Sequence, residues 1–448
     1  MAKFSHIPTD CEFPQLFEIA DPVKLAAKLN QHLGPAFAGR EMQVSECAIE
    51  QLNYRPGAAC VVLFSARIVN ERQEELGRQS FYGKLFRRPQ KLANTLRQQQ
   101  NRAWVQPRFG PALAQIPDWA MLLWAYPNDP RLPGLAQMSN PEIVLAKAQA
   151  APEKFGLTQR PAAITAEQTK YVPGRRCGYI YRMTLADGAP HAVYGKTYEY
   201  DDGENAFALM QQIWECEARR RGGFILPQPF SYDTEMKVLW QEAIAGESFA
   251  KIADRVPNLP EVAEEIGARL AAFHSAALPL ASKITFEFQV AEVQRAIIEI
   301  SRTFPDYAGR CAAIGEKLLS AAACLGTGVE TPVHGSFKFS HIFATPKGMA
   351  FIDFDGACCG DPGYDVGRFL AHLYKMKASW TLDPEVAEQT AANFCHAYNR
   401  AAASPLSPAR INWFAASHLV ASQVYKSVKR MDTSLVSKLL KLADQLCA

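Results

Sequence analysis

Apolar and polar residues alternate in the first third of the chain in a pattern that predicts β-strands around a Pro-Gly turn. The clearest stretch is QLNYRPGAACVVLFSARI (51–68), and a polar connector separates it from a second short strand, SFYGKLF (80–86). A basic, glutamine-rich segment, KLANTLRQQQNRAW (91–104), is typical of a helix. MLLWAY (121–126) then predicts a buried strand that enters a turn. Before them, residues 21–33 predict a short amphipathic helix.

The same order of elements returns about 117 residues later. QTKYVPGRRCGYIYRMTL (168–185) again carries a Pro-Gly turn, and HAVYGKTY (191–198) again contains Tyr-Gly-Lys. Five anchors keep their order at a nearly constant offset, which indicates an internal duplication. The paired anchors are Tyr54 and Tyr171, Pro56-Gly57 and Pro173-Gly174, Cys60 and Cys177, Tyr82-Gly83-Lys84 and Tyr194-Gly195-Lys196, and Leu123-Trp124 and Leu239-Trp240.

From about residue 255 the apolar residues recur at a spacing of about 3.6, which predicts a helical region. EVAEEIGARLAAFHSAAL (261–278) and VQRAIIEISRTF (293–304) are examples. One stretch, HGSFKFSHIFATPKGMAFIDFDGACCGDPGYD (334–365), interrupts this pattern. Its short apolar strands, HIFAT and MAFIDF, flank a turn at Lys347-Gly348. We therefore expect a small β-hairpin that holds polar loop residues inside a helical domain.

Composition narrows the class of protein. A length of 448 residues favours two or three domains, and a hydrophobic fraction of 48% is ample for a core. The formal net charge of +3 gives no sign of a nucleic-acid partner or a membrane surface. The eleven cysteines form no CxxC pair, so neither a zinc site nor a disulfide framework is expected. Without an apolar leader or a long apolar run, the expected location is cytoplasmic.

The interrupting stretch, HGSFKFSHIF…FIDFDGACCGDPGYD, resembles the HGD-x-x-x-x-N…IDFD…GDPxxD signature of aminoglycoside phosphotransferases and choline-kinase-like enzymes. The resemblance covers about 220 residues, from the second Pro-Gly turn to His372, and it includes the VLWQEAIAG strand and the LAAFHSA helix. It implies an α+β, two-lobed protein-kinase-like fold. An extra N-terminal β-rich, lobe-like module (1–150) would precede the usual β-rich lobe (151–247) and the helical lobe (248–448).

The resemblance also implies ATP and Mg²⁺ as cofactors and a small hydroxylated metabolite as substrate. Phosphoryl transfer depends mostly on positioning and on cationic stabilisation, so it needs a strand lysine for the phosphates and a carboxylate for the metal. Lys196 fits the lysine, and Asp353, at the end of an apolar strand, fits the metal ligand. Asp355 either serves the same metal or caps the next turn. Asp361 and Asp365 are expected to brace the loop.

Further residues are expected to contact the nucleotide. The helix partner of Lys196 is predicted to be Glu204, with Glu215 as the competitor, although Glu204 could equally complement the dipole at the helix start. The backbone of Glu242–Ile244 would face the base. Arg175, in the turn YVPGRRC, is a candidate phosphate contact, and the alternative is a solvent-facing turn.

The catalytic loop departs from the family pattern at two positions. Ser336 stands where the aspartate is expected, and a hydroxyl has no charge and is no base near neutral pH, so loss of general-base help would slow transfer roughly 10²- to 10⁴-fold. His341 stands at the asparagine position, and imidazole suits softer metals than Mg²⁺. His334 matches the leading histidine, a packed residue in relatives. Lys338 either supplies positive charge to a phosphate or substrate or is an exposed loop lysine.

Three functions stay open on this basis. The first is an ATP-dependent small-molecule phosphotransferase, and the second is a pseudokinase with a nucleotide-binding, regulatory or scaffolding role. The third is a structural partner protein without phosphate chemistry, against which the presence of Lys196 and Asp353 weighs. In the first repeat, Lys84 is followed by a segment (85–117) without any acidic residue, so that module is predicted to be a degenerate lobe. The sequence names neither the acceptor nor the oligomeric state.

Overall fold

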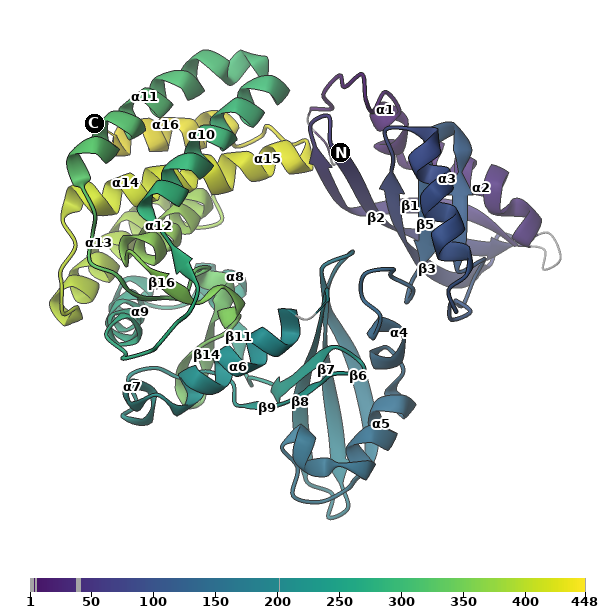
Figure 1. Cartoon of the computed structure of the whole chain (residues 1–448), viewed down its shortest axis with the longest axis horizontal. Coiled ribbons are helices and arrows are strands. Elements are labelled where there is room, and N and C mark those ends of the chain that lie inside the picture. Colours follow the sequence, from purple (N-terminus) through teal and green to yellow (C-terminus); the bar gives the residue numbers. More distant parts are fainter. Residues whose placement is uncertain (1–3, 5, 38–41, 201, 448) are drawn as a thin grey trace. The chain divides into compact units, whose positions relative to one another are not determined.

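The computed structural model describes residues 4, 6–37, 42–200 and 202–447, which divide into two compact units (Figure 1). The first unit comprises residues 1–204, 230–241 and 428–432, and the second comprises residues 205–229, 242–427 and 433–448. Antiparallel sheets and many helices confirm the predicted α+β class. The domain boundaries predicted near residues 150 and 247 are finer than this division and stay a prediction.

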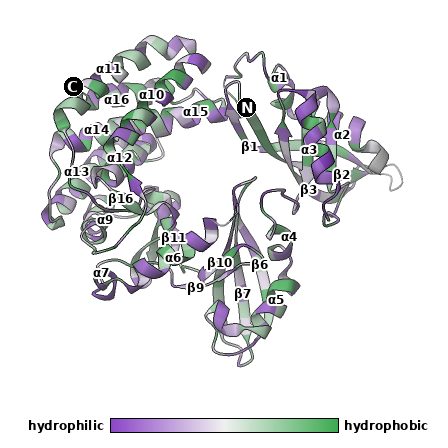
Figure 2. Ribbon diagram, viewed as in Figure 1, coloured by the Kyte–Doolittle hydropathy of each residue, from purple (hydrophilic) through white to green (hydrophobic). Residues whose placement is uncertain are grey.

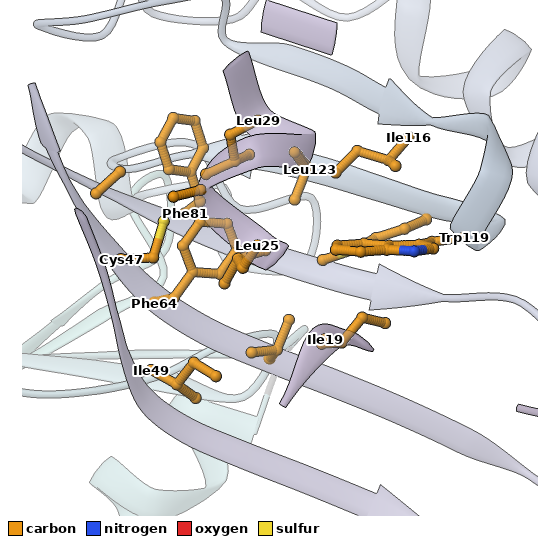
Figure 3. Packing of buried hydrophobic residues seen from close by; sticks show 14 of the residues in the cluster. Ile19, Leu25, Leu29, Cys47, Ile49, Phe64, Phe81, Ile116, Trp119 and Leu123 are labelled. Atoms are coloured by element: carbon orange, nitrogen blue, oxygen red, sulfur yellow. The ribbon is translucent and has the colours of Figure 1, made fainter. Parts of the chain in front are cut away.

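The first unit begins with an antiparallel five-stranded sheet that packs against N-terminal helices. Alternate residues of its second strand point to different cores, since Val62 and Phe64 join one apolar cluster and Leu63 joins another. Figure 3 shows the first cluster, in which Phe64 and Phe81 stack with ring centroids 5.5 Å apart. The strand order is β1 (Met42–Arg55), β2 (Ala59–Asn70), β3 (Glu75–Leu85), β5 (Met121–Ala125) and β4 (Leu113–Ile116). The helices are α1 (Leu16–Ile19), α2 (Pro22–Phe37) and α3 (Pro89–Gln100).

A second sheet in the same unit repeats this strand order. A helix again follows the third strand, and two helices again precede the first. Its core contains Trp240, whose ring centroid lies 5.5 Å from that of Tyr181 and 4.6 Å from that of Phe155. The strand order is β6 (Pro161–Val172), β7 (Arg176–Leu185), β8 (Pro190–Tyr198), β10 (Val238–Glu242) and β9 (Pro229–Asp233). The helices that precede this sheet are α4 (Leu135–Met138) and α5 (Pro141–Ala150). The helix that follows β8 is α6 (Asp202–Glu215), which belongs to the second unit from Asn205 onward.

One hydrogen-bond pattern occurs in both modules. In each, an aspartate carboxylate accepts one bond from a tyrosine hydroxyl and one from the backbone of the turn glycine. The donors to Asp10 are Tyr54 (2.6 Å) and Gly57 (2.8 Å), and the donors to Asp129 are Tyr171 (2.8 Å) and Gly174 (2.7 Å). Both glycines have φ near +60°, where a residue with a Cβ is strained. Sequence comparison found the tyrosines and glycines but missed the aspartates, which open the shared pattern D-x-x-x-P-x-L.

The second unit is mostly helical, as predicted. Its helices α9 and α13 pack closely, because a Cβ at Gly267 would lie only 2.5 Å from the carbonyl oxygen of Phe394. In Figure 2, hydrophobic and hydrophilic residues are mixed along these helices, which fits amphipathic elements. The helices are α7 (Glu217–Arg220), α8 (Phe249–Ile252), α9 (Leu259–His274), α10 (Phe286–Thr303), α11 (Ala308–Leu325), α12 (Gly363–Ala378), α13 (Pro384–Ala401), α14 (Pro408–His418), α15 (Tyr425–Arg430) and α16 (Val436–Leu446).

Two small sheets interrupt these helices. The predicted hairpin is confirmed, with Ile342 paired to Phe351 at one end and Thr345 paired to Gly348 at the turn. One sheet has the order β11 (Glu247–Ser248), β14 (Ile342–Thr345) and β15 (Gly348–Phe351). The other has the order β12 (Lys283–Ile284), β16 (Cys358–Gly360) and β13 (Thr331–Val333). Among the described residues, no helix is both long enough and apolar enough to cross a membrane.

Candidate functional site

The loop that contains Ser336 is held in place by a fully buried carboxylate. Asp365, in the first turn of α12, is 0% exposed and accepts hydrogen bonds from the backbone N–H groups of His334 and, at 3.0 Å, Gly335. His274 of α9 places its Nε2 3.2 Å from Asp365 Oδ2. Burial acts to raise the pKa of Asp365, but these hydrogen bonds, led by that of His274, hold the pKa below its ordinary value. Asp365 therefore has the bracing role predicted for it.

Asp361 braces the next part of the loop. Its Oδ1 accepts a hydrogen bond of 2.8 Å from the N–H of Gly363 at the start of α12, and its Oδ2 is paired with the guanidinium of Arg410. The same guanidinium donates to the carbonyl groups of Leu325 and Gly326. The end of α11, the start of α12 and α14 are thus joined at one buried ion pair.

Ser336 lies between two imidazole rings. Its Oγ is 3.2 Å from Nδ1 of His334, 3.2 Å from Nδ1 of His341 and 3.3 Å from the carbonyl oxygen of Asp353. His334 Nε2 lies 3.0 Å from the carbonyl oxygen of Ile352, which can only accept, so Nε2 carries the proton. Burial lowers the pKa of His334, so the ring is neutral and Nδ1 accepts. The one proton of the Ser336 hydroxyl is therefore shared between Nδ1 of His334 and the carbonyl oxygen of Asp353, and the hydroxyl oxygen accepts from Nδ1–H of His341.

The other nitrogen of His341 faces a carboxylate. His341 Nε2 lies 3.3 Å from Oδ2 of Asp353, and the two side chains are only 9% and 17% exposed. When both ring nitrogens carry protons, His341 is an imidazolium paired with Asp353. Asp353 has a φ of +67°, a conformation that non-glycine residues rarely adopt and that is often found at functional sites. The structure thus brings together four predicted site residues, namely His334, Ser336, His341 and Asp353.

The second unit also contains the other predicted residues Asp355, Lys338, Glu242 and Ile244. Asp355 is exposed in the short turn after Asp353, and Lys338 is half-buried in the loop. Glu242 is the last residue of β10 and Ile244 lies just after the strand, and the N–H of Glu242 donates to the carbonyl of Gln228 at 2.8 Å. Among the described residues, no group of three or more His, Cys, Asp or Glu side chains has the arrangement of a metal site.

Three predicted residues lie in the first unit. Lys196 on β8 is 7% exposed, and its Nζ is 4.9 Å from the ring centroid of Tyr198. Glu204, in the first turn of α6, is exposed and makes no hydrogen bond or ion pair with the described residues. Its predicted pairing with Lys196 stays a prediction. Arg175 is exposed in the Pro-Gly turn, where its N–H donates to the carbonyl of Val172 at 3.0 Å.

Sequence reasoning named Lys338 but missed the other cations that lie beside the loop. Arg368 of α12 donates to the carbonyl of Gly335 at 3.1 Å. One turn further, burial lowers the pKa of His372 well below its ordinary value, and nearby cations act in the same direction. These cations are Lys426, Lys338, Lys375 and Arg368. The signal was present in the sequence, because positions 368, 372 and 375 follow the GDPGYD motif at helical spacing.

Comparisons with known proteins agree with the motif. Residues 193–406 match the model of the phosphotransferase enzyme family, which confirms the resemblance predicted from the sequence. This segment contains the strand lysine Lys196 as well as the Ser336 loop and Asp353. No curated protein sequence matches the chain.

Several solved structures are similar at low identity. A thermostable mutant of the aminoglycoside phosphotransferase APH(4)-Ia, in a ternary complex with ADP and hygromycin B, has 14% identity and a TM-score of 0.46, covering 69% of this chain and 98% of that one. A choline/ethanolamine kinase family protein from Mesorhizobium loti has 14% identity and a TM-score of 0.45, covering 68% and 94%. Choline kinase from Cryptosporidium parvum Iowa II has 10% identity and a TM-score of 0.42, covering 68% and 94%.

Proposed function

We propose that this chain, whose residues 193–406 match the phosphotransferase enzyme family, binds ATP and transfers its phosphoryl group only slowly to a small hydroxylated metabolite. The observation that carries the proposal is the hydrogen bonding of Ser336. Its hydroxyl is engaged with His334 and His341, and no carboxylate stands in its place to orient an acceptor or take its proton. The absence of a general base slows transfer roughly 10²- to 10⁴-fold, while nucleotide binding does not need that base.

The nucleotide contacts are proposed residue by residue from the family motif. Lys196 is the proposed phosphate contact, because it occupies the strand-lysine position of the family motif and phosphoryl transfer needs a cation at the phosphates. The backbone of Glu242–Ile244 is proposed to face the base, with Arg175 as a further phosphate contact and Glu204 as the partner of Lys196. These assignments rest on the family motif.

Asp353 is the residue proposed to hold Mg²⁺, and Asp355 is the second candidate. Mg²⁺ is commonly bound by one or two carboxylates together with substrate phosphates, so a single half-buried carboxylate at the end of β15 fits this ion. Its chemistry would be to neutralise charge on the phosphates. His341, which faces Asp353 through Nε2, is the poorer ligand because imidazole suits softer metals.

The cations around His372 support an acceptor that carries negative charge. Lys338, Arg368, Lys375 and Lys426 are all half-buried and all act on the same imidazole. Positive charge concentrated in a partly desolvated site attracts anions and raises their local concentration. A phosphorylated or carboxylated metabolite with a free hydroxyl is therefore the proposed acceptor class.

The N-terminal module is proposed to be a duplicate of the sheet that carries Lys196, used for packing rather than for chemistry. The identical strand order of the two sheets supports the duplication, as does the aspartate that binds the Pro-Gly turn in both modules. The two copies also contact one another, since Gln51 donates to the carbonyl of Tyr171 at 3.1 Å.

A pseudokinase is the second candidate. The observation that favours it is that both ring nitrogens of His341 are engaged, one with Ser336 and one with Asp353. Such a protein would bind nucleotide for a regulatory or scaffolding purpose and would not turn it over. Product formation at high enzyme concentration separates the two candidates.

The first experiment is thermal stabilisation by ATP with and without Mg²⁺, because a ligand that binds only the native state must raise the apparent stability. We expect a Mg·ATP-dependent shift in the native chain that Lys196→Ala and Asp353→Ala both abolish. Lys84→Ala is the matched control, since Lys84 is the equivalent lysine of the first module and its replacement should leave the shift unchanged. No shift at saturating Mg·ATP would refute both candidates.

A further inference from the structure

A pocket of about 480 Å³ lies in the second unit, away from the loop of Ser336. It is formed by the end of α6, by α7 and the segment after it, by residues 242–245 and by the turn of the β14–β15 hairpin. The hairpin turn pairs Thr345 with Gly348, whereas His341 and Asp353 adjoin its other end. A volume of this size suits a small organic molecule. Neither Ser336 nor His341 nor Asp353 lines it.

The walls of this pocket are mainly apolar. Trp214, Phe224, Leu226, Ile244 and Pro346 contribute most of the large apolar side chains. Trp214 is covered on one side by the guanidinium group of Arg219, whose central carbon lies 3.3 Å from the ring centroid. A ligand that buries an apolar body here removes surface from water and is stabilised in proportion to that area.

The charges of the pocket are unbalanced. Three cationic side chains, Arg219, Arg220 and Lys347, line it together with one carboxylate, Glu242. The three cationic groups make no hydrogen bond or ion pair with the described residues. One carboxylate oxygen of Glu242, Oε2, accepts a hydrogen bond of 3.2 Å from the N–H of Gln228. Burial lowers the pKa of Arg219, and Arg220 acts in the same direction.

This charge pattern does not suit the base of a nucleotide. Nucleotide bases are uncharged near neutral pH, so a base in this pocket would leave Glu242, which acts electrostatically on Arg219, as the one lining carboxylate for three lining cations. A carboxylate or phosphate group would instead form charge-assisted hydrogen bonds with them, which are about twice as strong as neutral ones. Arginine is especially suited to such planar or tetrahedral anions.

We propose that the pocket is a second ligand site, separate from the nucleotide, for a small organic anion that carries one carboxylate or phosphate group on a flat apolar body. The apolar body packs on Trp214 and Ile244, and the anionic group is bound by Arg220 and Lys347. Residues 242–245 form part of the wall, so the ligand touches the same segment whose backbone is proposed to face the nucleotide base. Competition with Mg·ATP therefore decides whether the two ligands use different sides of this segment. The proposal does not depend on whether the chain transfers phosphate.

The test is titration of the full-length chain with 1-naphthoate and 1-naphthyl phosphate by calorimetry, with 1-naphthalenemethanol as the uncharged match. We expect at least one anion to bind with a dissociation constant of about 1 mM or tighter, and the alcohol to bind at least about tenfold more weakly. Binding of neither anion at that concentration overturns the proposal, and equal binding of the alcohol overturns the role of the cations.

Substitutions locate the binding. The double variant Arg220→Gln/Lys347→Gln should weaken the anion about tenfold or more and leave the alcohol unchanged. Arg221→Gln is the matched control, because Arg221 is the neighbouring exposed arginine, is paired with Glu217 and does not line the pocket. An equal loss in both variants would overturn the assignment of the site. Arg220 lies on the surface of α7, and Lys347 lies in an exposed turn. We therefore expect the double variant to keep the thermal transition of the native chain, and measuring that transition checks its folding.

Competition with nucleotide separates this site from the proposed ATP site. Saturating Mg·ATP should leave the anion bound, and the Lys196→Ala variant should bind the anion as the native chain does. If ATP displaces the anion competitively, the pocket is the base end of the nucleotide site and the proposal fails. If the chain binds the anion but no ATP, the proposed function fails and the second site remains.

Discussion

The carboxylate of Asp129 accepts a hydrogen bond of 2.8 Å from the hydroxyl of Tyr171, across a sequence separation of 42 residues. The same oxygen accepts the N–H of Gly174, and the other oxygen accepts the N–H of Arg131. Asp129 is 4% exposed, so these bonds replace water that the carboxylate has lost. They join the segment between the two sheets of the first unit to the Pro-Gly turn of the second sheet.

Asp129→Ala should therefore destabilise the first unit. The substitution leaves the Tyr171 hydroxyl and the Gly174 N–H buried without an acceptor, and each such group costs about 1–3 kcal/mol. We expect a loss of at least about 2 kcal/mol in the free energy of unfolding, measured by urea denaturation with circular dichroism. Asp254→Ala, at an exposed position, is the control and should lie within about 0.5 kcal/mol of the native chain. Equal stability of the two variants would show that the aspartate is dispensable.

A buried histidine should make the second unit sensitive to acid. Burial, with Arg368 acting in the same direction, lowers the pKa of His418 to about 3, while its Nε2 donates to the carbonyl of Tyr364 at 2.9 Å. The unfolded chain takes up a proton near pH 6.5 that the folded chain does not bind until about pH 3. The free energy of unfolding is therefore fully retained above pH about 6.5 and falls between these values, by at most about 1.4 kcal/mol per pH unit.

His418→Gln checks this directly. Glutamine can still donate to the carbonyl of Tyr364 but cannot take up a proton, so the slope of stability against pH between about 4 and 6 should fall by about one proton. His396→Gln, at an exposed position, should leave the slope unchanged. Urea denaturation at half-unit pH intervals measures both slopes. Identical slopes for native chain and His418→Gln would contradict the assignment.

The hydrogen bonds by which Asp365 holds the Ser336 loop can be tested by substitution. Asp365→Asn removes the charge that accepts hydrogen bonds from His274 and from the backbone of His334 and Gly335. The side-chain amide of the asparagine also points an N–H group at hydrogen-bond donors that the carboxylate accepted from. Because breaking a buried charged network by changing one partner costs about 3–5 kcal/mol, we expect a loss of that order in the second unit. Denaturation measures it, and Asp254→Asn, at an exposed position of the same unit, should be near neutral.

The sequence predicted much of this architecture because local pattern decides it. Alternating apolar and polar residues on either side of Pro-Gly turns predicted the strands of both modules. The turn at Lys347-Gly348 predicted the hairpin. It could not predict that His341 faces Asp353, since that contact depends on how two loop ends meet across the hairpin. Nor did it find Arg368 and His372, because the side of α12 that faces the loop is set by tertiary packing. Spacing suggested Glu204 as a partner of Lys196, and this pairing stays a prediction. Spacing alone could not show that Glu204 is exposed in the first turn of α6.

The decisive prediction concerns Ser336. In the native chain its hydroxyl is hydrogen-bonded to His334 and His341, so the loop already has the close contacts of a catalytic loop but no carboxylate. Ser336→Asp places a carboxylate where it can accept from Nδ1–H of His341 and orient an acceptor hydroxyl. If only the base has been lost, phosphoryl transfer should increase by about 10²- to 10⁴-fold, measured as ATP consumption with a panel of phosphorylated and carboxylated hydroxy compounds.

The matched control is Ser336→Asn, which has nearly the same shape as the aspartate variant but no charge and no basicity. It should show no gain, so a gain in both variants would mean that size rather than general-base chemistry limits the native chain. A second control, Ser336→Asp combined with Asp353→Ala, should lose the gain, because the proposed metal ligand is then missing. Unchanged ATP consumption in Ser336→Asp, with Mg·ATP binding intact, would leave the pseudokinase as the function of this fold. In that case the pairing of His341 with Asp353, and not the missing carboxylate alone, would be what holds the site inactive.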